Sequence, residues 1–145
     1  MTDKWASQLL FDDVVEGAEL ATITIPLSLH RLVMEAGANR DMAFMHHDKE
    51  AAIAAGATDV FANTFFLAGM FERLLREWVG LRGLIKKIGP LRMQSFNCVG
   101  DTLVFGAKVR AKKEFEGTVI LDLWAFNNGV QSVVAEATVI VPKHT

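Results

Sequence analysis

Hydrophobic residues recur with a helical period over residues 64–79, and this is the most regular pattern in the chain. They form a very wide apolar face that contains Phe65, Phe66, Leu67, Met70, Phe71, Leu74, Leu75 and Trp78. Charged residues occupy the remaining side, and Gly80 follows as a helix breaker. An apolar face of this width favours burial against a sheet rather than against a single helix. The pattern therefore predicts a long central helix that begins close to Asn63.

The C-terminal part of the chain instead alternates apolar and polar residues, as β-strands do. The alternation predicts four strands, over residues 84–99, 102–115, 118–126 and 130–141. The Asn-Asn-Gly sequence at 127–129 is a strong hairpin signal, because Asn and Gly tolerate positive φ. We therefore expect an α+β fold in which an antiparallel β-sheet wraps around the long helix.

The N-terminal half adds one strand and two shorter helices. Residues 19–27 have the β-branched alternation of a strand, and Pro26 limits that strand to a sheet edge or end. Ser28 can cap the helix that follows. The apolar face of that helix would contain Leu29, Leu32, Val33 and Ala36. Asp48 can cap a second, Ala-rich helix that stops at Gly56.

Composition indicates one domain, covering residues 1–145, in which residues 1–18 form a lead-in with Trp5 and Phe11 as candidate anchors. The chain is 51% hydrophobic and its mean hydropathy is +0.26. Such a surplus of apolar residues could cover a subunit interface or line an apolar ligand pocket. The formal net charge of −2 gives no reason to expect a nucleic-acid partner.

The cysteine count and the apolar runs bear on cellular location. Cys98 is the only cysteine, so no disulfide within the chain can form, which fits the cytoplasm. No apolar run reaches the length of a membrane span, and the N-terminus lacks the basic start and apolar stretch of a signal peptide. We expect a cytoplasmic protein with no membrane partner.

The candidate chemistry lies between the two short helices. Asp41 and His46 are five residues apart in a non-helical segment, so both side chains could point into one cleft. A carboxylate beside an imidazole can hold or activate a water molecule. The spacing alone favours a simpler interpretation, in which Asp41 caps a turn and His46 and His47 are surface residues ahead of a helix.

Other chemistry finds little support in the sequence. Adjacent histidines such as His46 and His47, followed by Asp48, seldom converge on one ion, so no metal is expected. Cys98 lies within a predicted strand, where inert burial is expected rather than nucleophilic chemistry. The sequence contains no GxSxG, P-loop or GxGxxG motif.

The segment around Asp41 resembles the MaoC-like branch of the hot-dog fold, the (R)-specific enoyl-CoA hydratases and dehydratases. Their motif is Asp-x-Asn-Pro-x-His-x-Asp, and Asp41, His46 and Asp48 match its charged positions. The Ala-rich EAAIAAG sequence, the long helix and the turn at 100–103 extend the resemblance over most of the chain. The looser pattern RD…HHD…DVFAN, followed by EWVG and LIKKIG, is still more similar to small subunits of heteromeric hydratases acting on steroid side-chain CoA esters.

The resemblance implies a reaction and a site. Asp41 and His46 would hold the water that adds across the C2=C3 bond of a trans-2-enoyl-CoA, or leaves in the reverse dehydration. Backbone N–H groups of Asn63, Thr64 and Phe65, which stand where the family has His-Gly-Met, would bind the thioester enolate. The substrate would be an acyl-CoA of fatty acid or steroid metabolism. No cofactor is implied, since CoA is part of the substrate.

Two positions depart from the family motif, because Ala43 and Phe44 replace its Asn and Pro. The exchange removes a polar group that helps to order the site and a rigid turn. Ala43, Phe44 and His47 are nevertheless expected next to the substrate, with His47 as a neighbour rather than a participant. These departures fit a chain that builds its site jointly with a second, different subunit.

The resemblance leaves the assembly and two other functions open. The chain would form a homodimer or a heteromer with another hot-dog subunit. It could instead be a non-catalytic acyl-CoA-binding subunit, although both Asp41 and His46 are retained. A hot-dog thioesterase is the third possibility, but it would need a carboxylate on the apolar side of the long helix. Glu72 and Glu77 fall on the polar side.

Overall fold

The computed structural model describes residues 7–144, so the candidate anchor Trp5 lies outside the described residues. Short 3-10 turns occur at Phe11–Asp13, Phe44–His46 and Phe115–Gly117. The helices and strands are, in chain order, β1 (Ile23–Pro26), α1 (Leu29–Ala38), α2 (Lys49–Ala54), α3 (Thr64–Val79), β2 (Leu84–Ile88), β3 (Arg92–Met93), β4 (Thr102–Lys113), β5 (Thr118–Asn127) and β6 (Val130–Ile140).

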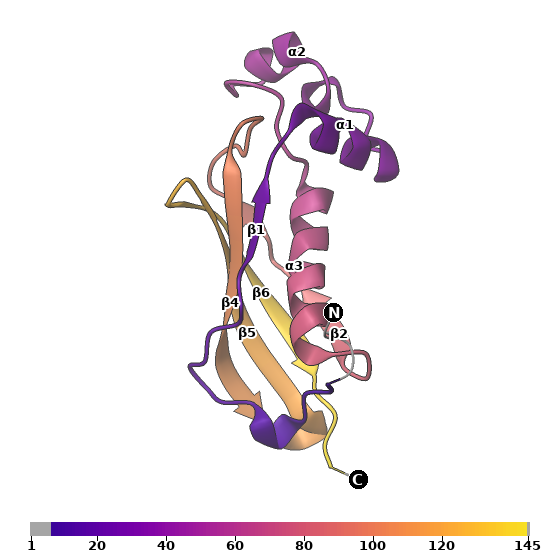
Figure 1. The fold of residues 1–145 in the computed structure, drawn as a ribbon, viewed down its shortest axis with the longest axis vertical. Helices are drawn as coiled ribbons and strands as arrows, with labels where there is room; N and C mark the ends of the chain where they lie inside the picture. Colours follow the sequence, from indigo (N-terminus) through magenta and orange to yellow (C-terminus); the bar gives the residue numbers. More distant parts are fainter. Residues whose placement is uncertain (1–6, 145) are drawn as a thin grey trace.

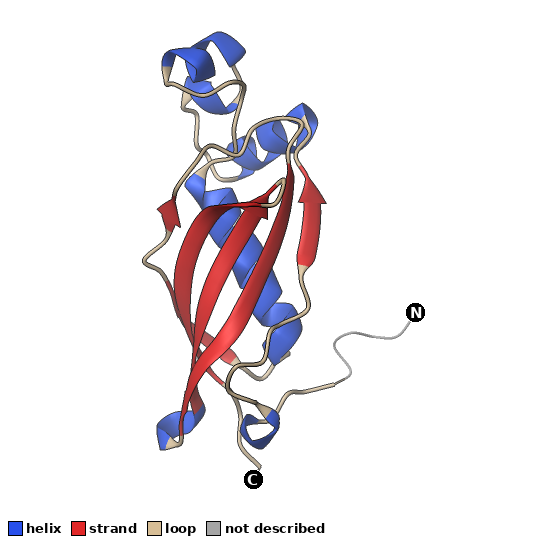
Figure 2. Cartoon of the chain, turned by 90° about the vertical axis from the view of Figure 1, so that its left-hand side faces the viewer, coloured by secondary structure: helices blue, strands red, loops and turns tan. Residues whose placement is uncertain are grey.

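All strands belong to one antiparallel sheet with the order β1-β4-β5-β6-β2. The short strand β3 also pairs with β6, beyond the end of β2. The sheet curls around α3, which lies against its concave face (Figures 1 and 2). Helices α1 and α2 sit together beyond one end of the sheet, next to the start of α3 (Figure 1). The expected sheet wrapped around a long helix is confirmed.

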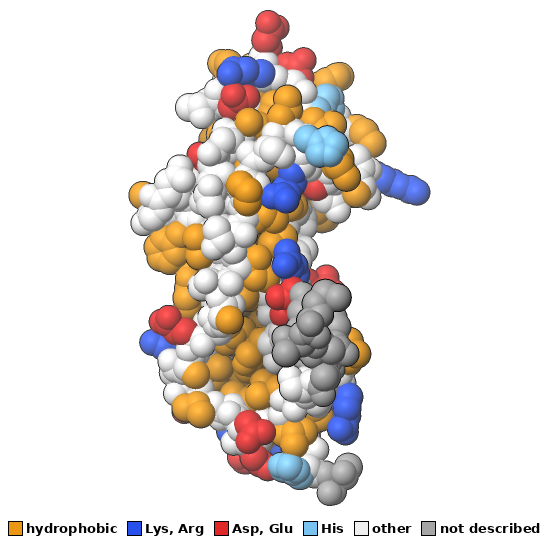
Figure 3. All heavy atoms as spheres, viewed as in Figure 1, with side chains coloured by type: hydrophobic (Ala, Val, Ile, Leu, Met, Phe, Trp, Pro, Cys, Tyr) orange, Lys and Arg blue, Asp and Glu red, His pale blue; other side chains and the backbone are white. Residues whose placement is uncertain are grey.

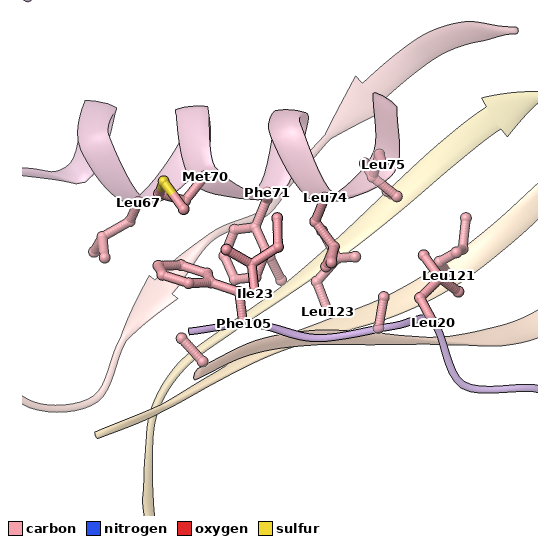
Figure 4. Packing of buried hydrophobic residues seen from close by; sticks show 14 of the residues in the cluster. Leu20, Ile23, Leu67, Met70, Phe71, Leu74, Leu75, Phe105, Leu121 and Leu123 are labelled. Atoms are coloured by element: carbon pink, nitrogen blue, oxygen red, sulfur yellow. The ribbon is translucent and has the colours of Figure 1, made fainter. Parts of the chain in front are cut away.

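The core lies between one face of α3 and the inner face of the sheet (Figure 4). Phe71 of α3 is fully buried and meets the edge of Phe105 on β4, with ring centroids 5.2 Å apart. The alternation predicted for the strands puts their apolar positions inward, because every second side chain of a strand points to the same face. The buried inner positions of β4 and β5 are Leu103, Phe105, Ala107, Val109, Val119, Leu121, Leu123 and Ala125.

Local signals correctly predicted several boundaries. Ser28 and Asp48 cap α1 and α2 through side-chain acceptors, as the sequence indicated. Helix α3 begins after Asn63 and ends at Gly80, whose φ of 78° is one that glycine adopts readily. The hairpin between β5 and β6 turns at Asn128 and Gly129, both with positive φ.

The structure differs from prediction in the strand expected over 84–99. It is two strands, β2 and β3, separated at Gly89-Pro90. Proline lacks the backbone N–H that a continuous ladder would need, so the pairing with β6 is interrupted there. The strand expected over 19–27 is also shorter, although β1 is at the edge of the sheet as Pro26 predicted.

The apolar face predicted for α1 is only half correct. Leu32 and Ala36 are buried, but Leu29 and Val33 are 50% and 42% exposed. The reason is the position of α1 beyond the sheet, where only one narrow side of the helix meets the rest of the protein (Figure 1). Phe11, the other candidate anchor of the lead-in, is fully buried in the core.

Figure 3 shows hydrophobic side chains over the middle and lower part of one face, with charged and histidine side chains at the helical end, at the opposite end and between them. Within residues 7–144, no helix has the length and apolar character needed to cross a membrane.

Replacing Phe71 with Ala tests the central packing. The variant should lose about 3–5 kcal/mol of unfolding free energy, because the cavity left beside Phe105 cannot close completely. Urea denaturation followed by circular dichroism measures the loss. Glu72→Ala, at an exposed position of the same helix, is the control and should change stability by about 0.5 kcal/mol or less. Equal effects in the two variants would contradict the packing described.

Candidate active site

Asp41 is held in place by the way in which α1 ends. Arg40 adopts a left-handed φ of 56°, its N–H donates to the Gly37 carbonyl, and the N–H of Asp41 donates to the Ala36 carbonyl at 2.9 Å. This pair of bonds is the Schellman arrangement that terminates many helices. The backbone of Asp41 therefore leaves the helix in a defined direction, toward the start of α3.

His46 is held by a carbonyl from another part of the chain. Its Nδ1 lies 2.8 Å from the carbonyl oxygen of Phe61, and the imidazole is only 6% exposed. Phe61 itself is fixed by a β-bridge to Cys98, and its ring packs against the imidazole edge at 5.0 Å between centroids. Because a carbonyl can only accept, Nδ1 carries a proton, which leaves Nε2 as the nitrogen that can bear a lone pair.

The two side chains face each other at the end of the sheet. His46 Nε2 and Asp41 Oδ2 are 3.4 Å apart, longer than a normal charge-assisted hydrogen bond. Asn63 Nδ2 donates to the same carboxylate oxygen at 3.0 Å, and the Ala43 N–H donates to Oδ1 at 3.3 Å. The carboxylate and the imidazole lone pair are thus both free to accept hydrogen bonds from one small polar molecule.

A cavity of about 340 Å³ opens in front of this pair. Apart from the two titratable side chains its walls are mainly apolar and aromatic. Its lining residues are Asp41, Met45, His46, Phe61, Ala62, Asn63, Thr64, Phe65, Met93 and Phe96.

The structure gathers five of the sequence-predicted site residues around this one cavity: Asp41, His46, Asn63, Thr64 and Phe65. The other three lie outside it. Ala43 contacts Asp41 through its backbone, whereas Phe44 is 71% exposed and its ring lies beside that of His47. Sequence reasoning missed the wall residues Met45, Phe61, Met93 and Phe96, because only the tertiary fold brings their separate segments together.

The first residues of α3 line the cavity together with Asn63, the residue that caps the helix. The Asn63 side chain caps the helix by accepting from the Phe66 N–H at 2.8 Å, while its own backbone N–H donates to Glu35. Within the described part of the chain, the N–H groups of Thr64 and Phe65 have no acceptor. The first N–H groups of a helix have no partner within it, and they favour negative charge.

Glu35 is a carboxylate near the site that sequence reasoning did not single out. It accepts from the Asn39 amide at 2.9 Å and from the Asn63 N–H at 3.4 Å. Burial raises its pKa above the usual value; the two hydrogen bonds and the nearby His46 oppose that shift, and Asp41 adds to it. Its place in the last turns of α1, just ahead of Asp41, is the one sequence feature that could have drawn attention to it.

Comparison with known proteins then identifies the family. Over 80 residues, 55% of this chain and 61% of the relative, the sequence is 38% identical to the 3-oxo-4,17-pregnadiene-20-carboxyl-CoA hydratase beta subunit of Mycobacterium tuberculosis. A chain of the ChsH1-ChsH2 complex from Mycobacterium tuberculosis is 30% identical, with 88% of this chain and 98% of that chain covered and a TM-score of 0.83. No family model matches the sequence.

More distant structures agree in fold. A MaoC-like dehydratase is 27% identical, with a TM-score of 0.83 over 94% of this chain and 43% of that chain. An (R)-hydratase from A. caviae, at 21% identity, has a TM-score of 0.81, with 90% of this chain and 98% of that chain covered. The chain belongs to the MaoC-like family of hot-dog proteins, as its resemblance implied.

The raised pKa of Glu35 predicts how stability depends on pH. A carboxyl group with a higher pKa in the folded than in the unfolded state binds its proton more tightly when folded. Its contribution to stability is therefore present at low pH and declines as pH rises from the unfolded pKa through the folded pKa. Urea titrations across this window should show that decline in the wild type and a weaker one in Glu35→Gln. The same slope in both proteins would show that burial does not raise the pKa of Glu35.

Proposed function

We propose that the chain catalyses hydration of a trans-2-enoyl-CoA to a 3-hydroxyacyl-CoA, or the reverse dehydration. The observation that carries the proposal is the pair of Asp41 Oδ2 and His46 Nε2, 3.4 Å apart at one wall of the cavity. The names of similar proteins, which include hydratases and a dehydratase, support the same reaction class.

The geometry supports a simple mechanism. A water between the two side chains would donate one hydrogen to His46 Nε2 and the other to Asp41 Oδ2, because both atoms are acceptors. As the water oxygen bonds to C3 of the substrate, one of its protons passes to the paired side chains. The acid form of the pair then gives a proton to C2. Water is consumed, the C2=C3 double bond becomes single, and the enzyme returns to its starting state.

The start of α3 is placed to assist this step. Negative charge develops on the thioester oxygen as water adds, and that oxygen needs preorganised hydrogen-bond donors. Thr64 and Phe65 line the cavity, and their N–H groups, which have no acceptor within the described residues, would supply such donors. The Asn63 N–H is already committed to Glu35, so we assign the donor role to the other two.

The walls favour a bulky apolar acyl group. Met45, Phe61, Phe65 and Phe96 present broad surfaces to the cavity, and none of the lining residues is a lysine or arginine. The relative from Mycobacterium tuberculosis carries the name of a pregnadiene carboxyl-CoA hydratase subunit. We therefore propose a steroid-like acyl-CoA as the substrate class, with the CoA phosphates outside this cavity.

A second subunit would complete the site. Phe65 lines the cavity and is 64% exposed, and Phe44, outside the cavity, is 71% exposed. Contact with water is unfavourable for such large rings. Two similar structures are described as complexes of two named components, ChsH1-ChsH2 and HadBC. These observations support a heteromer with another hot-dog subunit over an isolated chain.

The two alternative functions find less support. A non-catalytic acyl-CoA-binding subunit would not need the paired Asp41 and His46. A thioesterase would use a carboxylate of α3, but Glu72 is exposed and Glu77 pairs with Arg73 outside the cavity. Release of free CoA thiol from an acyl-CoA would indicate the thioesterase, because a hydratase leaves the thioester intact.

His46→Ala tests the proposed reaction. Hydration removes the conjugated enoyl-thioester absorbance, so the assay compares this signal for wild type and variant on one short-chain and one steroid enoyl-CoA. The variant should lose at least about 100-fold in kcat, the lower range for an acid–base group. His47→Ala, at the exposed neighbouring position, is the matched control and should keep kcat within about threefold of wild type.

Two other results would change the conclusion. A loss of less than about tenfold in folded His46→Ala would refute the role of His46. If the wild type consumes neither substrate, calorimetry with the same enoyl-CoA esters distinguishes the remaining possibilities. Binding without turnover would favour the acyl-CoA-binding subunit or one half of a heteromeric enzyme.

A further inference from the structure

The side chain of Asp41 has few contacts that could fix its direction. The distance from Asp41 Oδ2 to His46 Nε2 is 3.4 Å, and the distance from Asp41 Oδ1 to the Ala43 backbone nitrogen is 3.3 Å. Both are long for a hydrogen bond. The contact with Asn63 Nδ2, at 3.0 Å, is the shortest polar contact of this carboxylate. The position of the carboxylate oxygen nearest to His46 therefore depends mainly on the Asn63 amide.

Asn63 is suited to this task because its side chain is buried and hydrogen-bonded to the helix that it caps. It is 2% exposed, and its side-chain oxygen accepts from the Phe66 N–H, so the amide plane is fixed by the first turn of α3. Once the oxygen is used by the helix, the NH2 end of the amide must point the other way, toward Asp41.

Glu35 contacts Asn63 as well, through the backbone N–H of Asn63 rather than through its side chain. It accepts from the Asn63 backbone N–H and from the Asn39 side chain, and thereby joins the end of α1 to the start of α3. Asp41 leaves the end of the same helix, so the contact of Glu35 with the Asn63 N–H, at 3.4 Å, lies beside the Asp41–Asn63 pair. The titratable groups close to this arrangement are Glu35, Asp41 and His46, and α3 contributes the uncharged amide of Asn63.

We propose that Asn63 is a positioning residue that orients Asp41 through its side-chain amide, and that Glu35 holds Asn63 in place. The inference rests on the proposed hydration for its effect on rate. It also accounts for Ala43, which stands where the MaoC-like motif has a polar Asn. In this chain the ordering amide comes from the start of α3 instead of from the loop.

Asn63→Thr separates this role from helix capping, because Thr keeps a side-chain oxygen for the Phe66 N–H but has no amide to reach Asp41. We expect kcat to fall about 10- to 100-fold while KM changes by less than about threefold, because the amide acts on the direction of Asp41 rather than on substrate affinity. At a fixed pH, the NMR signal of the Asp41 carboxyl carbon should also move from its wild-type position, because the carboxylate loses the amide donor of Asn63.

Glu35→Gln tests the second half of the inference and provides a variant that keeps Asn63. Its kcat should also fall, but by less than in Asn63→Thr. The NMR signal of the Asn63 backbone N–H should lose the pH response that it shows in wild type. Glu72→Gln, on the exposed side of α3, is the control and should match wild type in both measurements.

The outcomes separate this inference from the proposed function. A kcat within about twofold of wild type in folded Asn63→Thr, with an unchanged Asp41 carboxyl signal, would overturn the positioning role. If the wild type has no hydratase activity, the proposed function fails, and the two NMR measurements test the contacts of Asn63 with Asp41 and Glu35 without it. Unchanged NMR signals in both variants would then overturn the inference.

Discussion

Burial of one face of α3 against the curled sheet is the constraint on which the rest of the structure depends. The helix is too apolar to be left in water, and only a sheet that bends around it covers enough of its surface. This packing sets where each end of α3 lies. Its first turn emerges at the end of the sheet, beside the segment that joins α1 to α2, and the cavity forms at that junction.

The site is built from chain segments that are each fixed by backbone contacts. Asp41 follows the Schellman end of α1, and His46 is oriented by the Phe61 carbonyl, which a bridge to Cys98 holds in turn. Neither side chain depends on the other for its position. Their separation of 3.4 Å therefore persists without a direct bond and leaves the facing lone pairs available to a third group.

The helical end of the molecule keeps side chains in environments that do not stabilise an isolated chain. A folded chain gains little from exposed rings such as Phe44 and Phe65, yet both stay largely accessible at the helical end. Glu35 is likewise partly removed from water, with only amide N–H groups as its hydrogen-bond donors within the described residues. Features that weaken an isolated chain at one place are typical of sites that bind a ligand or a partner.

Local signals in the sequence determined much of the fold. Asn63 and Gly80 mark the ends of α3, and Ser28, Asp48 and the Asn-Asn-Gly turn act through bonds within a few residues, so no tertiary knowledge was needed. The motif shared with the MaoC-like family likewise singled out Asp41 and His46, whose catalytic roles stay predictions.

The tertiary structure decided what depends on distant neighbours. Leu29 and Val33 fit an apolar helical face but are exposed, because the sheet ends before it reaches α1. The Phe61 carbonyl and the Glu35 carboxylate reach the site from segments that periodicity cannot place in space. Periodicity and capping describe interactions along the chain, whereas the site arises where separate segments meet, and that meeting is set by how α3 packs in the sheet.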